Sequence, residues 1–322
     1  MTAIAAILGK SSSHLRLFNS SRDMKAAVEL VDLCFSGTLD PDGQSYLRQL
    51  RQSANSPFTD WSLFSEPTSL PNAGYVWEED HRLVGYVSLI PFYNQFQRCY
   101  LIANVSVHPD YRNRGIGRAL TGKGLDYARE RNARATWLQV RDDNPAAVHI
   151  YQTVGFIERA RRTTWACERQ QGQITLPRAN FFLGPRRNRH WPTQRAWLDQ
   201  IYPSELAWHL PLDRRTLETG WKADLYRLFT LNYPRQWAAE QNGNLLAALS
   251  HQQTDGYADN IWLAIPPDFN ELAVRVLLQI ARRELGRSRP LTLNIPAGLA
   301  AQAIQDAGFH ALQTLLWMEY QF

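Results

Sequence analysis

The chain has 322 residues, of which 44% are hydrophobic and 20% charged, and its formal net charge is +5. This length favours two domains of roughly 150 residues each, and the hydrophobic share is enough for each to build a core. No stretch approaches the roughly 18 consecutive apolar residues of a membrane span, so no membrane partner is expected. The opening residues, up to position 14, lack the layout of a signal peptide and are expected to form a loose tail.

Cysteine usage favours a reducing compartment. Cys34, Cys99 and Cys167 are far apart and odd in number, so they suggest neither a metal site nor a disulfide frame. No set of His, Cys, Asp and Glu residues has the spacing of metal ligands. We therefore expect a cytoplasmic protein without a metal.

The basic residues are almost all arginine. Of the 35 Lys and Arg residues only four are Lys, at 10, 25, 123 and 222, which leaves 31 Arg. The guanidinium fork binds phosphate and carboxylate bidentately, although the same bias also fits a solvated surface. Nucleic acid is not the expected partner, because the arginine-rich stretch 178–189 has no interleaved aromatic spacing beyond Phe181, Phe182 and Trp191.

Strand and helix patterns alternate over the first half of the chain. In chain order they predict a strand at 15–21, helices at 22–35 and 43–53, hairpin strands at 73–80 and 82–94, a strand at 100–107, a helix ending at 131, a strand at 135–140, a helix ending at Gly155, and a strand pair over 156–169. The order βααβββαβαββ indicates an α/β mixed sheet with helices on both faces.

An internal repeat explains the length of the chain. Residues 105–120 align with 263–278, and residues 150–165 align with 303–318, so that a Pro-Asp-aromatic run and a Gly-Phe pair recur. The composition changes after Arg169, where Pro, Gly and Arg become frequent. We therefore predict two domains, 1–170 and 171–322, with a linker near 171–190; the alternative is that any two segments of this class would align as well.

The two copies differ in their loop chemistry. In the second copy Asn270, Ala273, Arg275 and Ile304 stand against Arg112, Gly115, Gly117 and Tyr151. The apolar spacing survives while these polar and glycine positions do not. The second copy is therefore expected to keep the fold without the chemistry.

A strand followed by Arg-x-x-Gly-x-Gly and a helix predicts an anion site. The first backbone N–H groups of a helix lack partners, and that end carries about half a positive charge. Gly115 and Gly117 allow a bulky diphosphate to approach the backbone. The alternatives are glycines that serve only a tight turn and arginines that form a solvated face. A dinucleotide fingerprint would need glycine where Leu120 stands. A P-loop would need Gly-Lys-Ser/Thr, and the segment "TGKGLD" does not provide it.

The segments "ANVSVHPDYRNRGIGRAL" and "WLQVRDDNPAAVHIYQTVGFIE" resemble the GNAT superfamily of acetyl-CoA-dependent N-acetyltransferases. The first is similar to its pyrophosphate-binding motif and the second to its CoA-arm and general-acid motif. The resemblance covers roughly residues 14–169 and is faint over 190–322. It implies two GNAT-like acyl-CoA N-acyltransferase domains in tandem, of which the second is degenerate.

The resemblance also implies the roles of particular residues. Val105 and Val107, on a splayed strand, would meet the pantetheine arm and the thioester. Asn144 would bond the CoA arm, and Tyr151 would act as the general acid toward the thiolate. The pyrophosphate would be wrapped by Arg112, Asn113, Arg114, Gly115, Ile116, Gly117 and Arg118.

The family's frequent carboxylate base is absent from the strand before the turn, where Asn104 and Ser106 stand instead. A water relay is a reasonable substitute, and the other candidates for the base are Glu78, Glu79, His81, His108 and His149. A site without a strong base suits an α-amine, which loses its proton at pH 7 for roughly 1.4 kcal/mol, better than a lysine amine, which costs roughly 4.6 kcal/mol.

The expected activity is transfer of an acetyl group from acetyl-CoA to a primary amine by direct attack in a ternary complex. The acceptor is an amine-bearing small molecule, a peptide or a protein, and a homodimer is compatible with the sequence. The alternative is a non-catalytic module that binds a CoA thioester or another protein. The intact Tyr151 in one copy and its loss in the other favour the enzyme.

Overall fold

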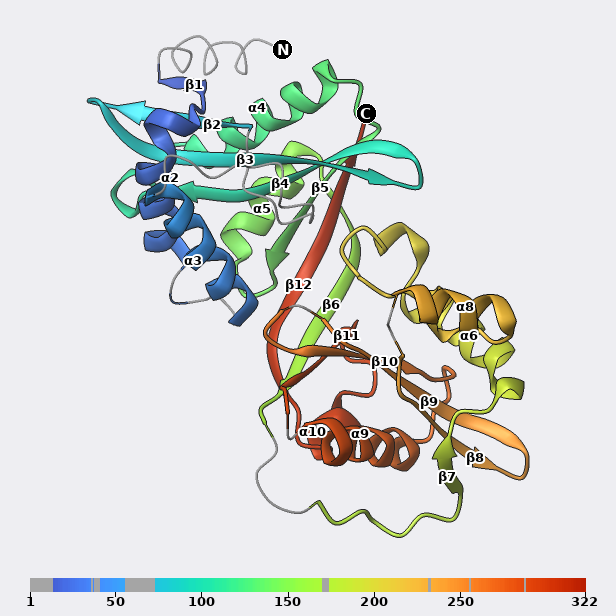
Figure 1. Cartoon of the computed structure of the whole chain (residues 1–322). Helices are drawn as coiled ribbons and strands as arrows, with labels where there is room; N and C mark the ends of the chain where they lie inside the picture. Colours follow the sequence, from blue (N-terminus) through green and yellow to red (C-terminus); the bar gives the residue numbers. More distant parts are fainter. Residues whose placement is uncertain are drawn as a thin grey trace. The chain divides into compact units, whose positions relative to one another are not determined.

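The computed structural model describes residues 14–35, 37, 41–55, 73–169, 174–230, 233–254, 256–286 and 288–322. The tail expected at the start of the chain lies outside these residues. The chain divides into two compact units (Figure 1). Unit 1 comprises Met1–Ala160 together with Leu315–Phe322, and unit 2 comprises Arg161–Thr314.

Unit 1 contains the elements that the sequence patterns predict, in the same order. They are β1 (Leu15–Leu17), α2 (Ser20–Phe35), α3 (Pro41–Asn55), β2 (Gly74–Glu79), β3 (Arg82–Asn94), β4 (Gln97–Val107), η2 (Pro109–Tyr111), α4 (Ile116–Glu130), β5 (Ala135–Arg141), α5 (Pro145–Val154) and the start of β6 (Ile157–Cys167). Its strands run in the order β1-β2-β3-β4-β5, and β12 (His310–Gln321) follows β5. All of these neighbours are antiparallel except β4 and β5.

Local chemistry explains how these elements begin, end and pack. The predicted hairpin between β2 and β3 turns at Asp80 and His81, which both have positive φ, as the turns that match the strand twist require. Helices α2 and α3 cover one face of the sheet, and α4 and α5 cover the other (Figure 1). Helix α4 lies close to the sheet at two glycine positions. A Cβ added at Gly85 would come within 2.9 Å of the Ile116 side chain, and one added at Gly124 within 3.1 Å of the Ile102 side chain.

Unit 2 repeats this order of elements. It contains the rest of β6, β7 (Phe182–Pro185), η3 (Asn188–His190), α6 (Trp191–Ile201), η4 (Ser204–Leu206), α7 (Arg214–Leu217), α8 (Trp221–Thr230), β8 (Gln236–Gln241), β9 (Asn244–Gln252), β10 (Asp259–Ala264), α9 (Glu271–Leu285), β11 (Leu291–Pro296), α10 (Ala301–Asp306) and the start of β12. Its strands run in the order β6-β11-β10-β9-β8-β7, and β10 and β11 are parallel, as β4 and β5 are in unit 1. A left-handed glycine follows the last helix of each repeat: Gly155 is the C-cap of α5, and Gly308 comes directly after Ala307, the C-cap of α10.

The prediction of a strand pair over 156–169 is wrong. This segment forms one continuous strand, β6, because Ile157–Cys167 contains no Gly, Pro, Asn or Asp that would turn the chain. In unit 2, Arg162–Cys167 pairs with β11. In unit 1, Leu315–Gln321 of β12 pairs with β5. Each repeat therefore supplies its last strand to the sheet of the other.

Strand β12 contributes core side chains to unit 1. Leu316 and Met318 are buried in the same cluster as Leu138, Val140 and Tyr151. Directly opposite residues of an antiparallel pair share a face of the sheet, and Leu316 pairs with Val140 and Met318 with Leu138. The end of the chain is thus part of the core around Tyr151.

We expect Met318→Ala to destabilise unit 1 by about 2–5 kcal/mol, because a fully buried side chain leaves a cavity. The matched control is Gln321→Ala, which removes an exposed side chain from the same strand and should change stability by less than about 0.5 kcal/mol. Urea denaturation of both variants checks this. Equal midpoints for the two variants would contradict the role of β12 in this core.

Candidate functional site

Strands β4 and β5 diverge beside the predicted anion site. Their parallel pairing covers only Cys99–Leu101 and Ala135–Trp137. Beyond these residues β4 continues to Val107 and β5 to Arg141 without pairing to each other. The splayed strand that the resemblance implies is therefore present, and Val105 and Val107 lie on its open part. Peptide groups in such a gap are available to a ligand.

A bulge in β4 lies within this gap. Asn104 has a φ of 54°, and the pairing with β3 shifts register between Ser106 and Ala103. The Asn104 amide donates to the Tyr46 hydroxyl and to Ser88 Oγ, both at 3.0 Å. The Ser106 hydroxyl donates to the Asn104 carbonyl at 3.1 Å. The two residues that replace the family's carboxylate are thus held by the protein, and neither is a strong base.

Helix α4 begins without a side-chain cap. Gly115 is the N-cap residue with a φ of 78°, and no side chain accepts from the first turn. Asn113 also has a positive φ, 61°. Ile116 is buried and fixes the start of the helix in the core. No N-cap side chain therefore occupies the first N–H groups of α4. The anion site at this helix start stays a prediction.

The three arginines of the turn have different partners. Arg112 donates to the Val107 carbonyl at 3.2 Å. Arg114 donates to the Asp110 carbonyl at 3.0 Å and lies 4.8 Å from the centre of the Tyr111 ring. Arg118 is exposed and has no partner among the described residues. Of the three, Arg118 is the guanidinium most available to an anion.

Helix α5 holds the other two predicted site residues. Asn144 is its N-cap, and its side-chain oxygen accepts from the Ala147 N–H at 3.2 Å, so its amide nitrogen is left for a ligand. Tyr151 is buried in the core and packs edge-on against Phe156 at 6.1 Å. Burial raises the pKa of Tyr151 to about 12. The phenol is therefore protonated throughout the physiological range.

Three of the other candidate bases have polar partners in the protein, and two are exposed. Glu78 pairs with Arg16. The Glu79 carboxylate accepts from Trp77 and pairs with Arg114 of the turn at 3.7 Å. The His108 ring hydrogen-bonds Arg82 and the Asp110 N–H in the turn itself. His81 and His149 are exposed, and the His81 ring lies 3.9 Å from the Glu78 carboxylate.

Two polar residues beside the gap were missed by the sequence analysis. Gln139 lies two residues past the last β4–β5 pair, and its amide nitrogen is buried without a partner among the residues described. Glu319 of β12 lies opposite Trp137, and it accepts from Arg159 at 2.8 Å. By strand alternation both side chains lie on the face opposite Leu138 and Tyr151. Local sequence gives no signal for Glu319, because its place depends on the pairing of β12 with β5.

In unit 2 the corresponding helix start is closed by its own side chain. Asn270 is the N-cap of α9, and its side-chain oxygen accepts from the Ala273 N–H at 2.9 Å. The sequence alignment set Asn270 against Arg112, but by position in the fold Asn270 replaces Gly115. A donor that an uncapped helix would offer to an anion is therefore already used.

The gap between β10 and β11 in unit 2 is filled as well. Their pairing ends at Asn260 and Thr292. Beyond it, the Leu263 N–H donates to the Tyr202 hydroxyl at 3.2 Å. The buried Arg162 guanidinium donates to the Ile201 carbonyl at 2.8 Å and lies over the Tyr202 ring. Leu263 is the counterpart of Val105, so a tyrosine hydroxyl occupies the strand position that unit 1 leaves open.

Within the described part of the chain, no group of three or more His, Cys, Asp or Glu side chains is placed to hold a metal ion. Within the same residues, no helix is long and apolar enough to cross a membrane.

Residues 33–156 match the family described as "Acetyltransferase (GNAT) family". This segment is a GNAT-family domain. It contains the gap, the turn and helix α5, so the resemblance of the two sequence motifs is confirmed. The match does not extend into the second repeat.

Curated relatives match the chain over short segments. A streptothricin acetyltransferase from Streptomyces lavendulae is 36% identical over 77 residues, which is 24% of this chain and 40% of that protein. A [ribosomal protein bS18]-alanine N-acetyltransferase from Escherichia coli K12 is 39% identical over 62 residues, 19% of this chain and 42% of that protein. The chain thus spans less than half the length of these relatives.

Solved structures extend the likeness to both repeats. A GCN5-related N-acetyltransferase from Sphaerobacter thermophilus covers 95% of this chain and 95% of its own, with a TM-score of 0.57 and 14% identity. A GCN5-related glucosamine N-acetyltransferase region of a fungal multi-domain enzyme covers 95% of this chain and 38% of its own, with a TM-score of 0.56 and 12% identity. At this identity the likeness concerns the fold alone, and it confirms the predicted pair of GNAT-like folds.

We expect Gly117→Val to weaken acetyl-CoA binding about tenfold or more, because a side chain there blocks approach to the first N–H groups of α4. The fold should tolerate the change, since a Cβ at Gly117 meets Ile150 and Val107 at no less than 3.7 Å. Gly122→Val is the control in the same helix, where a Cβ meets nothing within 4 Å. Titration calorimetry of both variants measures the effect, and equal affinities would remove the turn from the binding site.

Calorimetry should also count one acetyl-CoA per chain. Unit 1 offers an open helix start and an open strand, whereas Asn270 and Tyr202 occupy both positions in unit 2. A second site that persists in Gly117→Val would show that unit 2 binds the ligand despite these contacts.

Proposed function

We propose that the chain is an acetyl-CoA-dependent N-acetyltransferase whose active site lies in unit 1. The observation that carries this proposal is the uncapped start of α4 beside the open part of β4. The GNAT-family match over the same residues supports it. The predicted location of the protein is the cytoplasm.

The binding residues fit an acyl-CoA. The backbone from Arg112 to Arg118 is proposed to hold the diphosphate, with Gly115 and Gly117 giving room. Val105 would bond the pantetheine arm through its peptide groups and Val107 through its N–H, since the Val107 carbonyl already accepts from Arg112. Asn144 would bond it through its amide nitrogen. Acetyl-CoA supplies the activated acetyl group.

In the proposed reaction a neutral amine attacks the carbonyl carbon of the thioester. A C–N bond forms, the C–S bond breaks, and the sulfur leaves as a thiolate. The amine nitrogen gives its proton to water, because Asn104 and Ser106 are not basic and are engaged with the protein. N–H groups on the open part of β4 would stabilise the negative charge that develops on the carbonyl oxygen.

Tyr151 is proposed to stabilise the leaving sulfur. Its pKa is about 12, whereas a thiol has a pKa of about 8.5. Complete proton transfer would be uphill by about 3.5 pKa units, or roughly 5 kcal/mol. We therefore assign Tyr151 as a general acid that acts mainly through a hydrogen bond, which strengthens as negative charge develops on sulfur.

The acceptor is proposed to be a weakly basic amine, such as the α-amine of a peptide or of a small molecule. A site without a strong base cannot easily deprotonate a lysine side chain. The names of the two relatives fit this range, since one is a streptothricin acetyltransferase and the other acts on the alanine of a ribosomal protein.

The experiment that tests the function is a free-thiol release assay with acetyl-CoA against a panel of amines. Thiol release that depends on one class of amine supports the enzyme. Acetyl-CoA binding without release for any amine would favour the alternative, a module that binds a CoA thioester without turnover.

Tyr151→Phe should lower kcat about tenfold or more while acetyl-CoA affinity stays similar, because the lost hydroxyl acts on the leaving group. Tyr320→Phe is the control, since Tyr320 packs in the same aromatic cluster against Phe156. The raised pKa means that Tyr151 keeps its proton up to about pH 12, so a loss of kcat between pH 8 and pH 10 cannot come from its ionisation. If Tyr151→Phe abolished such an alkaline limb, this assignment would be wrong.

A further inference from the structure

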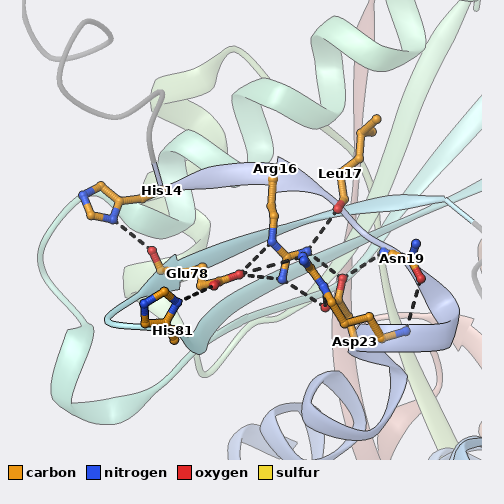
Figure 2. Close-up of polar contacts among 8 residues, drawn as sticks. His14, Arg16, Leu17, Asn19, Asp23, Glu78 and His81 are labelled. Carbon is orange, nitrogen blue, oxygen red and sulfur yellow. Dashed lines mark hydrogen bonds and ion pairs between the residues drawn. The ribbon is translucent and has the colours of Figure 1, made fainter.

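The first strand of unit 1 shows how this chain neutralises a half-buried arginine. Arg16 of β1 pairs with Asp23 and with Glu78, both at 2.6 Å (Figure 2). Burial alone would lower the pKa of Arg16, but hydrogen bonds to these two carboxylates outweigh it and raise the pKa. The charge is therefore balanced within the protein.

In unit 2, Arg186 directly follows the first strand, β7, and its charge is not balanced by carboxylates in this way. Arg186 donates through Nε to the Gln236 side-chain oxygen at 3.1 Å and through Nη2 to the Leu217 carbonyl. Its guanidinium lies 5.5 Å from the centre of the Trp191 ring. Among the described residues no carboxylate lies within ion-pair distance of Arg186. Its partners are neutral, although charges that lose water normally require a counter-ion.

A second arginine lies close to the first. Arg227 donates to the carbonyls of Thr216 and Glu218, at 2.8 and 2.9 Å, and pairs with the exposed Asp224. Burial lowers the pKa of Arg186 to about 10, and the positive charge of Arg227 lowers it as well. Two guanidinium groups thus repel each other at this position.

The two arginines share a cavity of about 200 Å³. It is lined by Arg186, Asn188, Glu218, Arg227, Tyr233, Pro234 and Gln236. Glu218 contributes its only carboxylate, which pairs with neither arginine within the described part of unit 2. The Gln236 side-chain oxygen is already shared by Arg186, Gln194 and Ser250. The wall therefore has an excess of donors over free acceptors.

We propose that this cavity binds a small oxyanion of the phosphate or carboxylate class between Arg186 and Arg227. Such an anion supplies the negative charge that Asp23 and Glu78 supply to Arg16, and its oxygens accept bidentate bonds from guanidinium groups. The volume suits it, since a water molecule takes about 30 Å³ and a phosphate fits with water remaining. The residues that line this site all lie in unit 2.

The test is equilibrium binding of inorganic phosphate and of acetate to the full chain, at constant ionic strength set with sodium chloride. Wild type should bind at least one of them saturably, with a rise in Tm of several degrees. Phosphate alone would identify a phosphate site, and acetate alone would identify a carboxylate site. The matched control is Arg187→Gln, which changes the neighbouring exposed arginine outside the cavity.

Arg186→Gln should lose at least tenfold in affinity, while Arg187→Gln binds as wild type does. If Arg186→Gln does not fold, Arg227→Gln takes its place, since Arg227 contacts the cavity from α8. Absence of saturable binding to wild type overturns the proposal. Equal binding by wild type and the folded cavity variant also overturns it, because the anion would then lie elsewhere.

Discussion

The divergence of β4 from β5 is the constraint on which the rest of the site depends. The parallel pair opens after Leu101 and Trp137 and leaves peptide groups on the facing edges of both strands without strand partners. Each strand must therefore be held in place by hydrogen bonds on its other edge. Strand β3 holds β4, and β12 holds β5 over its whole length. The gap can therefore be open and rigid at once, and α4 can present its first turn beside it without a cap.

The two repeats show how little separates an open site from a closed one. Both have the same order of elements and the same diverging parallel pair. In unit 2 one asparagine caps α9 and one tyrosine hydroxyl takes a strand N–H. These are ordinary stabilising contacts, and each satisfies a group that unit 1 leaves unsatisfied. Closing such a site thus adds stability, whereas keeping it open in unit 1 has a cost that a bound ligand would offset.

The features predicted correctly from the sequence are those that depend on residues close together in the chain. The hairpin at Asp80 and His81, the helix ends at Gly115 and Gly155, and the N-cap at Asn144 follow from local chemistry. Contacts between distant segments were not predictable. The pairing of β12 with β5, the place of Glu319 and the hydroxyl of Tyr202 at Leu263 depend on which strand lies beside which. The prediction of a second strand after residue 156 was wrong for the same reason, because the strand that pairs with β5 is β12, from the end of the chain.

The exchange of last strands explains why a repeat can lose its chemistry and still be retained. Leu316 and Met318 belong to the second repeat in sequence, yet they pack around Tyr151 in the core of unit 1. Removing the second repeat would leave the edge of β5 unpaired and the site of Tyr151 without part of its wall. Unit 1 therefore needs the second repeat as the source of β12, whether or not that repeat binds a ligand. Asn270 can stand where unit 1 has Gly115 because β12, not the turn before α9, is what unit 1 requires.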